Sequence, residues 1–253
     1  MTASSPTIDL QLAHRSVRRF LDEPVTDEQL ETVIAAAQAA SQSSNLQVWS
    51  VVAVRDEGRK RRLSRSIGGH RYVEEASVFL VWVADFRRAA NIVETTGARL
   101  ETIGYLENTL VAVVDSGIAA QNALLAAESL GLGGVFVGSI RNNPEAVIAE
   151  LGLPEYTFPV FGLALGVPDP SEQAGLKPRL PQSAVLHHEV YDETAWQQPA
   201  ADYEGDIAAY YAGYGQGDYS WVAKLTARIS TVAGLHGREH IRESLEKQGF
   251  ASR

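Results

Sequence analysis

The amino-acid sequence predicts a protein of the α+β class, because strand and helix patterns occur together along one chain. Three apolar segments, 48–54, 78–84 and 156–166, are rich in β-branched and aromatic residues and are typical of buried strands. Apolar residues at helical spacing predict a helix over 26–40, and an almost entirely apolar segment predicts a longer helix over 110–127. We therefore expect a sheet that packs against helices.

Composition excludes several classes of function. The chain has 253 residues, of which 45% are hydrophobic and 21% charged, as in an ordinary soluble globular protein. Its formal net charge of −9 argues against nucleic acid or an anionic membrane as the main partner. There is no cysteine, which excludes thiol catalysis, disulfides and thiolate metal sites, and the six histidines form no metal-binding pattern. We expect no apolar run long enough to span a membrane and no signal peptide, and hence a cytoplasmic protein.

The first helix and the first strand have clear limits. Thr26 and Gln29 have the spacing of a capping box, which should start the helix that ends near Ala40. The strand at 48–54 is nearly continuous in apolar character, so we expect it to be buried on both faces. Three further segments follow: a basic, solvent-exposed helix at 56–66, a turn at 67–73, and a polar stretch at 91–101 that is either a mobile lid or a surface excursion.

The segment 110–127 is apolar on most sides of a helix. Its only polar residues are Asp115, Ser116, Gln121 and Asn122. A helix on the surface would show a single apolar stripe. This helix must therefore be enclosed, either in a large core or across a subunit interface.

Glycines at 131–134 end this helix and precede a short strand. They resemble a dinucleotide fingerprint, but Phe136 stands where the third glycine belongs and the helix comes before the strand, so we reject a Rossmann site. Pro144 should open a short helix that Asn142 or Asn143 caps. Further helices are expected at 203–211, 219–230 and 238–247. We find no repeat and no linker, and we expect one domain, 1–253, with a C-terminal helical extension from about residue 201.

Two basic clusters are candidate anion sites. The stretch from His14 to Phe20 places four groups that can carry positive charge and one hydroxyl in a loop, where backbone N–H groups around Ser16 would add donors. Lys177 and Arg179 lie in a second loop that two prolines stiffen. Each cluster could also be a solvated basic turn.

Four motifs in order resemble the nitroreductase superfamily, and in particular its NADPH-dependent, oxygen-insensitive nitroreductase and Frp-type flavin reductase branch. They are His14–Phe20, Ser41–Gln47, Gln121–Asn143 and Leu176–Pro181. The resemblance implies a nitroreductase-like fold: a central, mostly antiparallel sheet flanked by helices, with the long buried helix at a homodimer interface. It also implies FMN as cofactor, NADPH or NADH as co-substrate, and ping-pong, two-electron reduction of nitroaromatics or quinones.

The resemblance implies a cofactor site in which the chemistry takes place on FMN and no side chain is itself catalytic. Arg15 and Arg179, with His14, would hold the phosphate, and Arg18 and Lys177 would tune the flavin or meet the nicotinamide. The full set of implied cofactor-binding residues is His14, Arg15, Ser16, Arg18, Gln42, Ser43, Ser44, His70, Arg71, Tyr72, Phe136, Val137, Gly138, Ser139, Lys177 and Arg179.

This chain departs from the pattern of the branch at several positions. Gln42, Asn45 and His70 replace its commoner residues, which should alter the polarity around the ring more than FMN retention. The segment at 213–215 lacks the arginine that usually meets the 2′-phosphate of NADPH, and the nearby basic residue is Lys224. NADPH and NADH therefore both remain candidate donors. Two alternatives stay open: a flavin reductase that supplies reduced FMN to a partner monooxygenase, and a non-catalytic flavin-binding protein.

Overall fold

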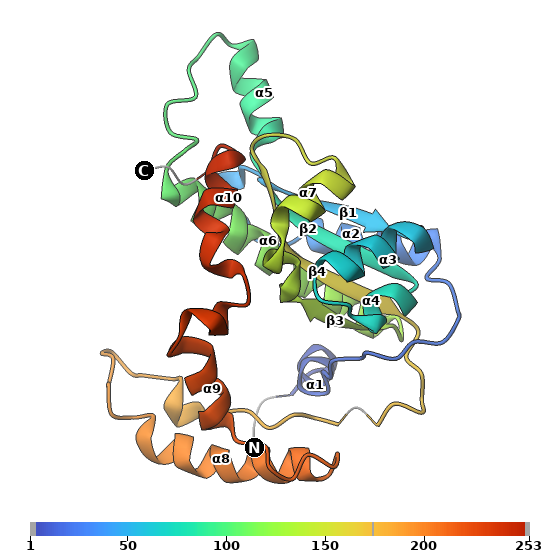
Figure 1. Ribbon diagram of the computed structural model, residues 1–253, viewed down its shortest axis with the longest axis vertical. Helices are drawn as coiled ribbons and strands as arrows, with labels where there is room; N and C mark the ends of the chain where they lie inside the picture. The colour runs from blue at the N-terminus through green and yellow to red at the C-terminus, as the bar shows by residue number, and fades with distance from the viewer. Residues whose placement is uncertain (1–3, 174, 251–253) are drawn as a thin grey trace. The chain divides into compact units, whose positions relative to one another are not determined.

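The computed structural model describes residues 4–173 and 175–250, which form two compact units (Figure 1). The first unit comprises Met1–Ala174 and Gly237–Arg253, and the second comprises Gly175–His236. We expected one domain with a helical extension from about residue 201, whereas the second unit begins at Gly175. That both units form a single folding domain stays a prediction.

The first unit contains a four-stranded antiparallel sheet with the order β1-β2-β4-β3. Its strands are β1 (Trp49–Val54), β2 (Val78–Asp85), β3 (Gly133–Val137) and β4 (Thr157–Gly166). β2 and β4 lie in the centre and are almost completely buried. The fold is therefore the expected α+β class, with an antiparallel sheet flanked by helices.

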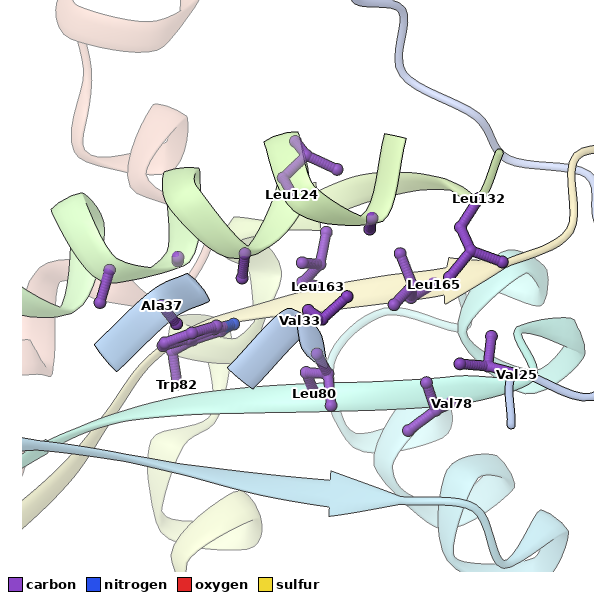
Figure 2. Packing of buried hydrophobic residues seen from close by; sticks show 14 of the residues in the cluster. Val25, Val33, Ala37, Val78, Leu80, Trp82, Leu124, Leu132, Leu163 and Leu165 are labelled. Atoms are coloured by element: carbon purple, nitrogen blue, oxygen red, sulfur yellow. The ribbon is translucent and has the colours of Figure 1, made fainter. Parts of the chain in front are cut away.

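Helices cover both faces of this sheet (Figure 1). α2 (Asp27–Gln38) and α6 (Leu106–Ser129) pack on one face, where Val33, Ala37 and Leu124 meet Trp82 and Leu163 (Figure 2). On the opposite face lie α3 (Glu57–Ser66), α4 (Arg71–Glu75) and α7 (Pro144–Leu151). Because the side chains of a strand alternate between faces, each central strand supplies both cores.

Local sequence patterns predict the starts of two helices correctly. Thr26 and Gln29 form the predicted capping box, although α2 ends at Gln38 rather than near Ala40. Asn143, rather than Asn142, caps α7 by accepting a hydrogen bond from the N–H of Ala146, with Pro144 at the first helical position.

Three predictions about exposure and local structure were wrong in part. β1 is not buried on both faces, because it lies at the edge of the sheet and Ala53 is exposed. The predicted turn at 67–73 runs into α4, which begins at Arg71. The basic helix α3 exposes its arginines, yet it buries Lys60 and Leu63 on the side that faces the sheet.

α6 is longer than predicted, and only one of its sides is enclosed by this chain. Small residues dominate the buried side, whereas Leu106, Leu110, Val114 and Ile118 are exposed at intervals of four residues. The expectation that no segment could span a membrane was wrong as a statement about length and composition. α6 has a mean hydropathy of 1.5 over its best 18-residue window, of which 44% is buried, and the core helix of a globular protein passes the same test.

The remaining elements complete the two units. The first unit also contains α1 (Pro6–Leu12), the 3-10 turn η1 (Ser43–Asn45), α5 (Arg87–Thr95), η2 (Gly138–Asn142), η5 (Arg238–His240) and α10 (Ile241–Lys247). The second unit contains η3 (Gln182–Ala184), α8 (Gln197–Ala212), α9 (Trp221–Ile229) and η4 (Val232–Leu235). The predicted helices at 203–211 and 219–230 thus correspond to α8 and α9, and the predicted helix at 238–247 is α-helical only from Ile241.

Candidate functional site

The basic stretch His14–Phe20 runs as an extended segment along the end of β3 and β4. The N–H of Val17 donates to the carbonyl of Gly134 at 3.0 Å, and Phe20 forms an antiparallel bridge with Pro168. The N–H of Leu21 donates to the carbonyl of Val167 at 2.9 Å. The stretch is therefore a loop, as expected, and it lies between α1 and α2, but the end of the sheet fixes its course.

The apolar residues of this stretch, Val17 and Phe20, pack on two glycines of the sheet. Gly133 and Gly166 are paired across β3 and β4. A Cβ atom at Gly133 would lie 2.7 Å from Val17 Cγ2, and one at Gly166 would lie 2.8 Å from the ring of Phe20. Since real Cβ atoms do not approach so closely, glycine at both positions lets Val17 and Phe20 pack directly on the sheet backbone.

The backbone donors expected around Ser16 are largely committed within the protein. The carboxylate of Glu172 accepts the N–H groups of Arg18 and Arg19 at 2.9 Å each, and Val17 donates to the sheet. The prediction that these N–H groups would bind an anion was therefore wrong for residues 17–19. The side chains of Arg15 and Arg18 stay exposed, and neither has an ion pair among the described residues.

His14 has a partner inside the chain. Its Nδ1 lies 2.6 Å from Oε1 of Glu128 near the end of α6, and both side chains are largely buried. This contact ties the start of the basic stretch to α6. A role for His14 beside the phosphate stays a prediction, with Nε2 as the nitrogen not used in this pair.

The Ser-rich loop after α2 has an unusual backbone. Ser44, Asn45 and Gln47 have φ of 48°, 54° and 54°, in the left-handed region. The buried carboxylate of Asp115 accepts the N–H of Ser43 at 3.1 and 3.2 Å. Oε1 of Gln42 is buried and has no hydrogen-bond partner within the described structure.

The turn at 67–73 is held from α3. Ser64 Oγ donates to the carbonyl of His70 at 3.0 Å, and Lys60 Nζ donates to the carbonyl of Ala76. The rings of His70 and Tyr72 stack at a centroid distance of 5.2 Å, and burial lowers the pKa of His70.

Arg18, Arg71 and Tyr72 are brought together although they are distant in the sequence. They line one groove of about 940 Å³. Burial raises the pKa of the Tyr72 hydroxyl, and the positive charge of Arg18 opposes that rise. The guanidinium of Arg71, in contrast, is paired with Glu75 one turn along α4.

The end of β3 contributes the last predicted group in this unit. Phe136 is partly exposed and meets Phe161 edge to face at 5.4 Å, whereas Val137 is buried. The hydroxyl of Ser139 is buried without a hydrogen-bond partner in the described structure, and Gly138 precedes it at the start of η2.

Lys177 and Arg179 belong to the second compact unit. Lys177 Nζ lies 5.3 Å from the ring centroid of Tyr211, a cation–π contact. Tyr203 donates to the carbonyl of Pro178 at 3.3 Å and so fixes the loop between the two cations. The convergence of these cations with Arg15 stays a prediction.

The residues of the first unit fit a flavin nucleotide. Guanidinium groups without a described ion pair suit a phosphate. The buried oxygens of Gln42 and Ser139 have no described hydrogen-bond partner, and such groups usually bond to a ligand or an ordered water. An isoalloxazine ring offers both a ring N–H and carbonyl oxygens, which such groups can bind. Within residues 4–173 and 175–250, no group of three or more His, Asp or Glu side chains is arranged to hold a metal ion.

Four positioning residues were not predicted from the sequence. They are Glu128, Glu172, Asp115 and the glycine pair member Gly166. Asp115 could have been noticed as the only acidic residue in an eighteen-residue apolar segment. Glu128 and Glu172 carry no local signal, because their partners lie more than one hundred residues away.

Comparison with known proteins gives a consistent result over the whole chain. A sequence model described as the Nitroreductase family matches residues 12–167, and one described as the Nitroreductase family, C-terminal domain, matches residues 177–253. The NADPH-flavin oxidoreductase of Vibrio harveyi is 43% identical over 249 residues, which is 98% of this chain and 99% of that protein. The oxygen-insensitive NADPH nitroreductase of Salmonella typhimurium is 41% identical over 98% of this chain and 100% of its own length.

A solved structure described as the NADPH:FMN oxidoreductase from Vibrio harveyi complexed with NAD+ has the same fold. It superposes with a TM-score of 0.86 at 41% identity and covers 98% of this chain and 99% of that chain.

We predict that Gly166→Ala destabilises the protein. The new methyl group would push the ring of Phe20 off the sheet, at a cost of about 1–3 kcal/mol in the free energy of unfolding. Urea denaturation measures this loss. Gly205→Ala is the matched control, since Gly205 lies exposed in α8 with nothing within 4 Å, and it should stabilise by about 0.5–1 kcal/mol. Equal effects of the two substitutions would contradict the seat for Phe20.

We also predict a pH dependence of stability that His70 causes. Because burial places the folded-state pKa of His70 below its ordinary value of 6.5, the unfolded state takes up the proton first as the pH falls. The stability contribution of neutral His70 is thus present above pH 6.5 and is lost on acidification. Between about pH 7.5 and about pH 5.5, urea denaturation should show a smaller loss for His70→Gln than for the wild type. An identical loss would contradict this assignment.

Proposed function

The chain belongs to the nitroreductase family, and from this we propose that it is an oxidoreductase that uses FMN and NAD(P)H to reduce nitroaromatics and quinones. The observation that supports the proposal is a set of polar groups of the first unit that have no partner among the described residues. Gln42 and Ser139 bury oxygens that have no hydrogen-bond partner among the described residues, and the exposed Arg15 and Arg18 have no ion pair among them. A bound flavin would satisfy these groups.

The chain's own residues would bind and orient the cofactor. Arg15 and Ser16 would meet the phosphate and ribityl chain, supported by the extended course of the stretch along β3 and β4. Gln42, Ser43 and Ser44 would hydrogen-bond the edge of the ring. Gly138 would allow close approach of the backbone, and Phe136 and Val137 would lie near the ring. Lys177 and Arg179 would add positive charge from the second unit.

When bound, FMN supplies a two-electron carrier that accepts hydride and passes it on as a unit. The protein's contribution is electrostatic. Cationic side chains such as Arg18 would stabilise negative charge that develops on the ring. Tyr72 lines the same groove as Arg18, and its ring stacks on that of His70.

A homodimer is part of this proposal. The stripe Leu106, Leu110, Val114 and Ile118 on α6 is apolar and stays exposed among the residues that the structure describes. A second copy of α6 would remove it from water, and large exposed apolar patches commonly mark interfaces. The proposal also includes small-molecule substrates and a cytoplasmic location, where nicotinamide nucleotides are available.

The preferred nicotinamide is open between two candidates. The relatives compared above are described as NADPH enzymes. In this chain, however, the segment around Tyr214 has no arginine, and Lys224 is the nearby cation. Stopped-flow reduction of the bound flavin by NADPH and by NADH in parallel will assign the donor.

The central experiment follows the colour of the purified protein. It should bind FMN, bleach anaerobically with a nicotinamide donor, and recover its absorbance when a nitroaromatic or quinone is added. A protein with no affinity for added FMN would refute the proposal. Flavin binding without reduction by either nicotinamide would instead support a non-catalytic flavin-binding protein.

A flavin reductase is the second candidate function. It is favoured by the 43% identity to a protein described as an NADPH-flavin oxidoreductase. Turnover that depends on added free flavin, with little direct reduction of nitroaromatics, would support this alternative, in which reduced FMN passes to a partner monooxygenase.

We predict that Val114→Asp weakens the dimer. A carboxylate in the middle of the apolar stripe would lose its hydration at the interface, which costs several kcal/mol unless it finds a partner. Analytical ultracentrifugation should show a dimer for the wild type and a shift toward monomer for the variant. Arg65→Asp on α3, which covers the opposite face of the sheet, adds more negative charge and should leave the dimer intact. A monomeric wild type would contradict the interface.

We predict that Arg179→Ala weakens FMN binding. Loss of a charged hydrogen bond to the phosphate should cost about 1.5–3 kcal/mol, or roughly 10- to 150-fold in the dissociation constant. Quenching of FMN fluorescence measures the constant. Lys224→Ala removes an exposed cation from the same unit and should leave FMN affinity unchanged. Unaltered affinity in Arg179→Ala would show that this loop does not hold the phosphate.

A further inference from the structure

The loop at residues 42–47 needs an external restraint to keep its conformation. Ser44, Asn45 and Gln47 all have positive φ without being glycine. Each such residue costs about 1–3 kcal/mol relative to an ordinary backbone, so the conformation persists only where surrounding contacts fix it. The loop itself supplies one backbone bond, from the N–H of Leu46 to the carbonyl of Ser43 at 3.0 Å.

One restraint comes from α6 at the start of the loop. Both carboxylate oxygens of Asp115 accept the N–H of Ser43, at 3.1 and 3.2 Å. Asp115 is only 2% exposed, and Ser43 is its only described hydrogen-bond partner. A buried carboxylate that accepts a single backbone N–H is costly to maintain, so its position argues for a specific purpose.

A second restraint comes from α5 at the far end of the loop. Nη2 of Arg88 donates to the carbonyl of Gln47 at 2.5 Å and to the carbonyl of Trp49 at 3.2 Å. Arg88 is half exposed, and its other nitrogen lies 4.0 Å from Asp85. Hydrogen bonds therefore hold the loop at both ends. The buried one is the contact of Asp115 with Ser43, next to Gln42.

From this arrangement we propose that Asp115 is a positioning residue for the flavin. By holding the N–H of Ser43, it would set the left-handed turn that presents Gln42, Ser43 and Ser44 to the edge of the ring. This inference rests on the proposed function, because those three residues meet a flavin only if the protein binds one. In this proposal α6 both positions the loop through Asp115 and presents the exposed apolar stripe, to which the preceding residue, Val114, belongs.

The first test uses the wild-type apoprotein and needs no flavin. Hydrogen exchange resolved to single residues should show the Ser43 amide exchanging at least roughly 10-fold more slowly than the amides of Ser44 and Asn45, because only Ser43 donates to a buried acceptor. Exchange of Ser43 as fast as its neighbours would overturn the proposal.

The second test compares three variants. Asp115→Ala removes the acceptor and should speed exchange across 42–47 and weaken FMN roughly 10-fold or more. Asp115→Asn keeps one acceptor oxygen and should retain FMN affinity within roughly 3-fold of the wild type. Ser116→Ala is the matched control, since Ser116 is buried beside Asp115 and donates within α6 to the carbonyl of Ala112.

The outcomes separate positioning from general stability. Recovery in Asp115→Asn together with normal exchange and affinity in Ser116→Ala supports the proposal. Equal losses in Asp115→Ala and Ser116→Ala, or no loss in Asp115→Ala, would overturn it. If the wild type binds no FMN, the proposed function fails, while the exchange of the Ser43 amide still reports whether Asp115 holds the loop. If Asp115→Ala does not fold, the wild-type exchange rates and Asp115→Asn decide the matter.

Discussion

The packing of α6 on the sheet is the contact on which the rest of the structure depends. Ala119, Ala120, Ala123 and Ala127 are fully buried against the central strands. Their small side chains let a long helix lie close to the sheet, with α2 beside it (Figure 2). Once this side is fixed, the helical period determines where every other residue of α6 must lie.

Several features of the site follow from that one placement. Asp115 reaches the loop after α2, and Glu128, near the other end of the helix, meets His14. The side of α6 away from the sheet presents branched apolar residues instead of alanine. A single helix thus connects the core, two segments of the candidate site and the surface at which we propose that a second copy binds.

The sequence predicted the elements whose causes are local. Thr26 with Gln29 and Asn143 with Pro144 mark helix starts through contacts within four residues, so the structure has them as expected. The strands could also be predicted, because their apolar segments are local features of the sequence. The exposure of β1 could not be predicted, because the order of strands in a sheet is a long-range property and β1 has a neighbour on one side only.

The site shows the same division between local and distant causes. Motifs identified the residues that we propose face the cofactor, but not those that hold them in place. Glu172 binds the backbone of Arg18 across more than one hundred and fifty residues, and no periodic pattern reports such a pair. The same is true of Gly166, whose lack of a side chain matters only because Phe20 lies on it.

The extended course of residues 17–21 along the sheet also limits how this region can change in length. Val17 and Phe20 occupy fixed seats, and main-chain bonds at Val17 and Leu21 bracket the segment. An insertion or deletion between them would move either Val17 or Phe20 off its glycine. Homologous chains should therefore keep this spacing constant, and gain or lose residues only before Arg15 or after Asp22.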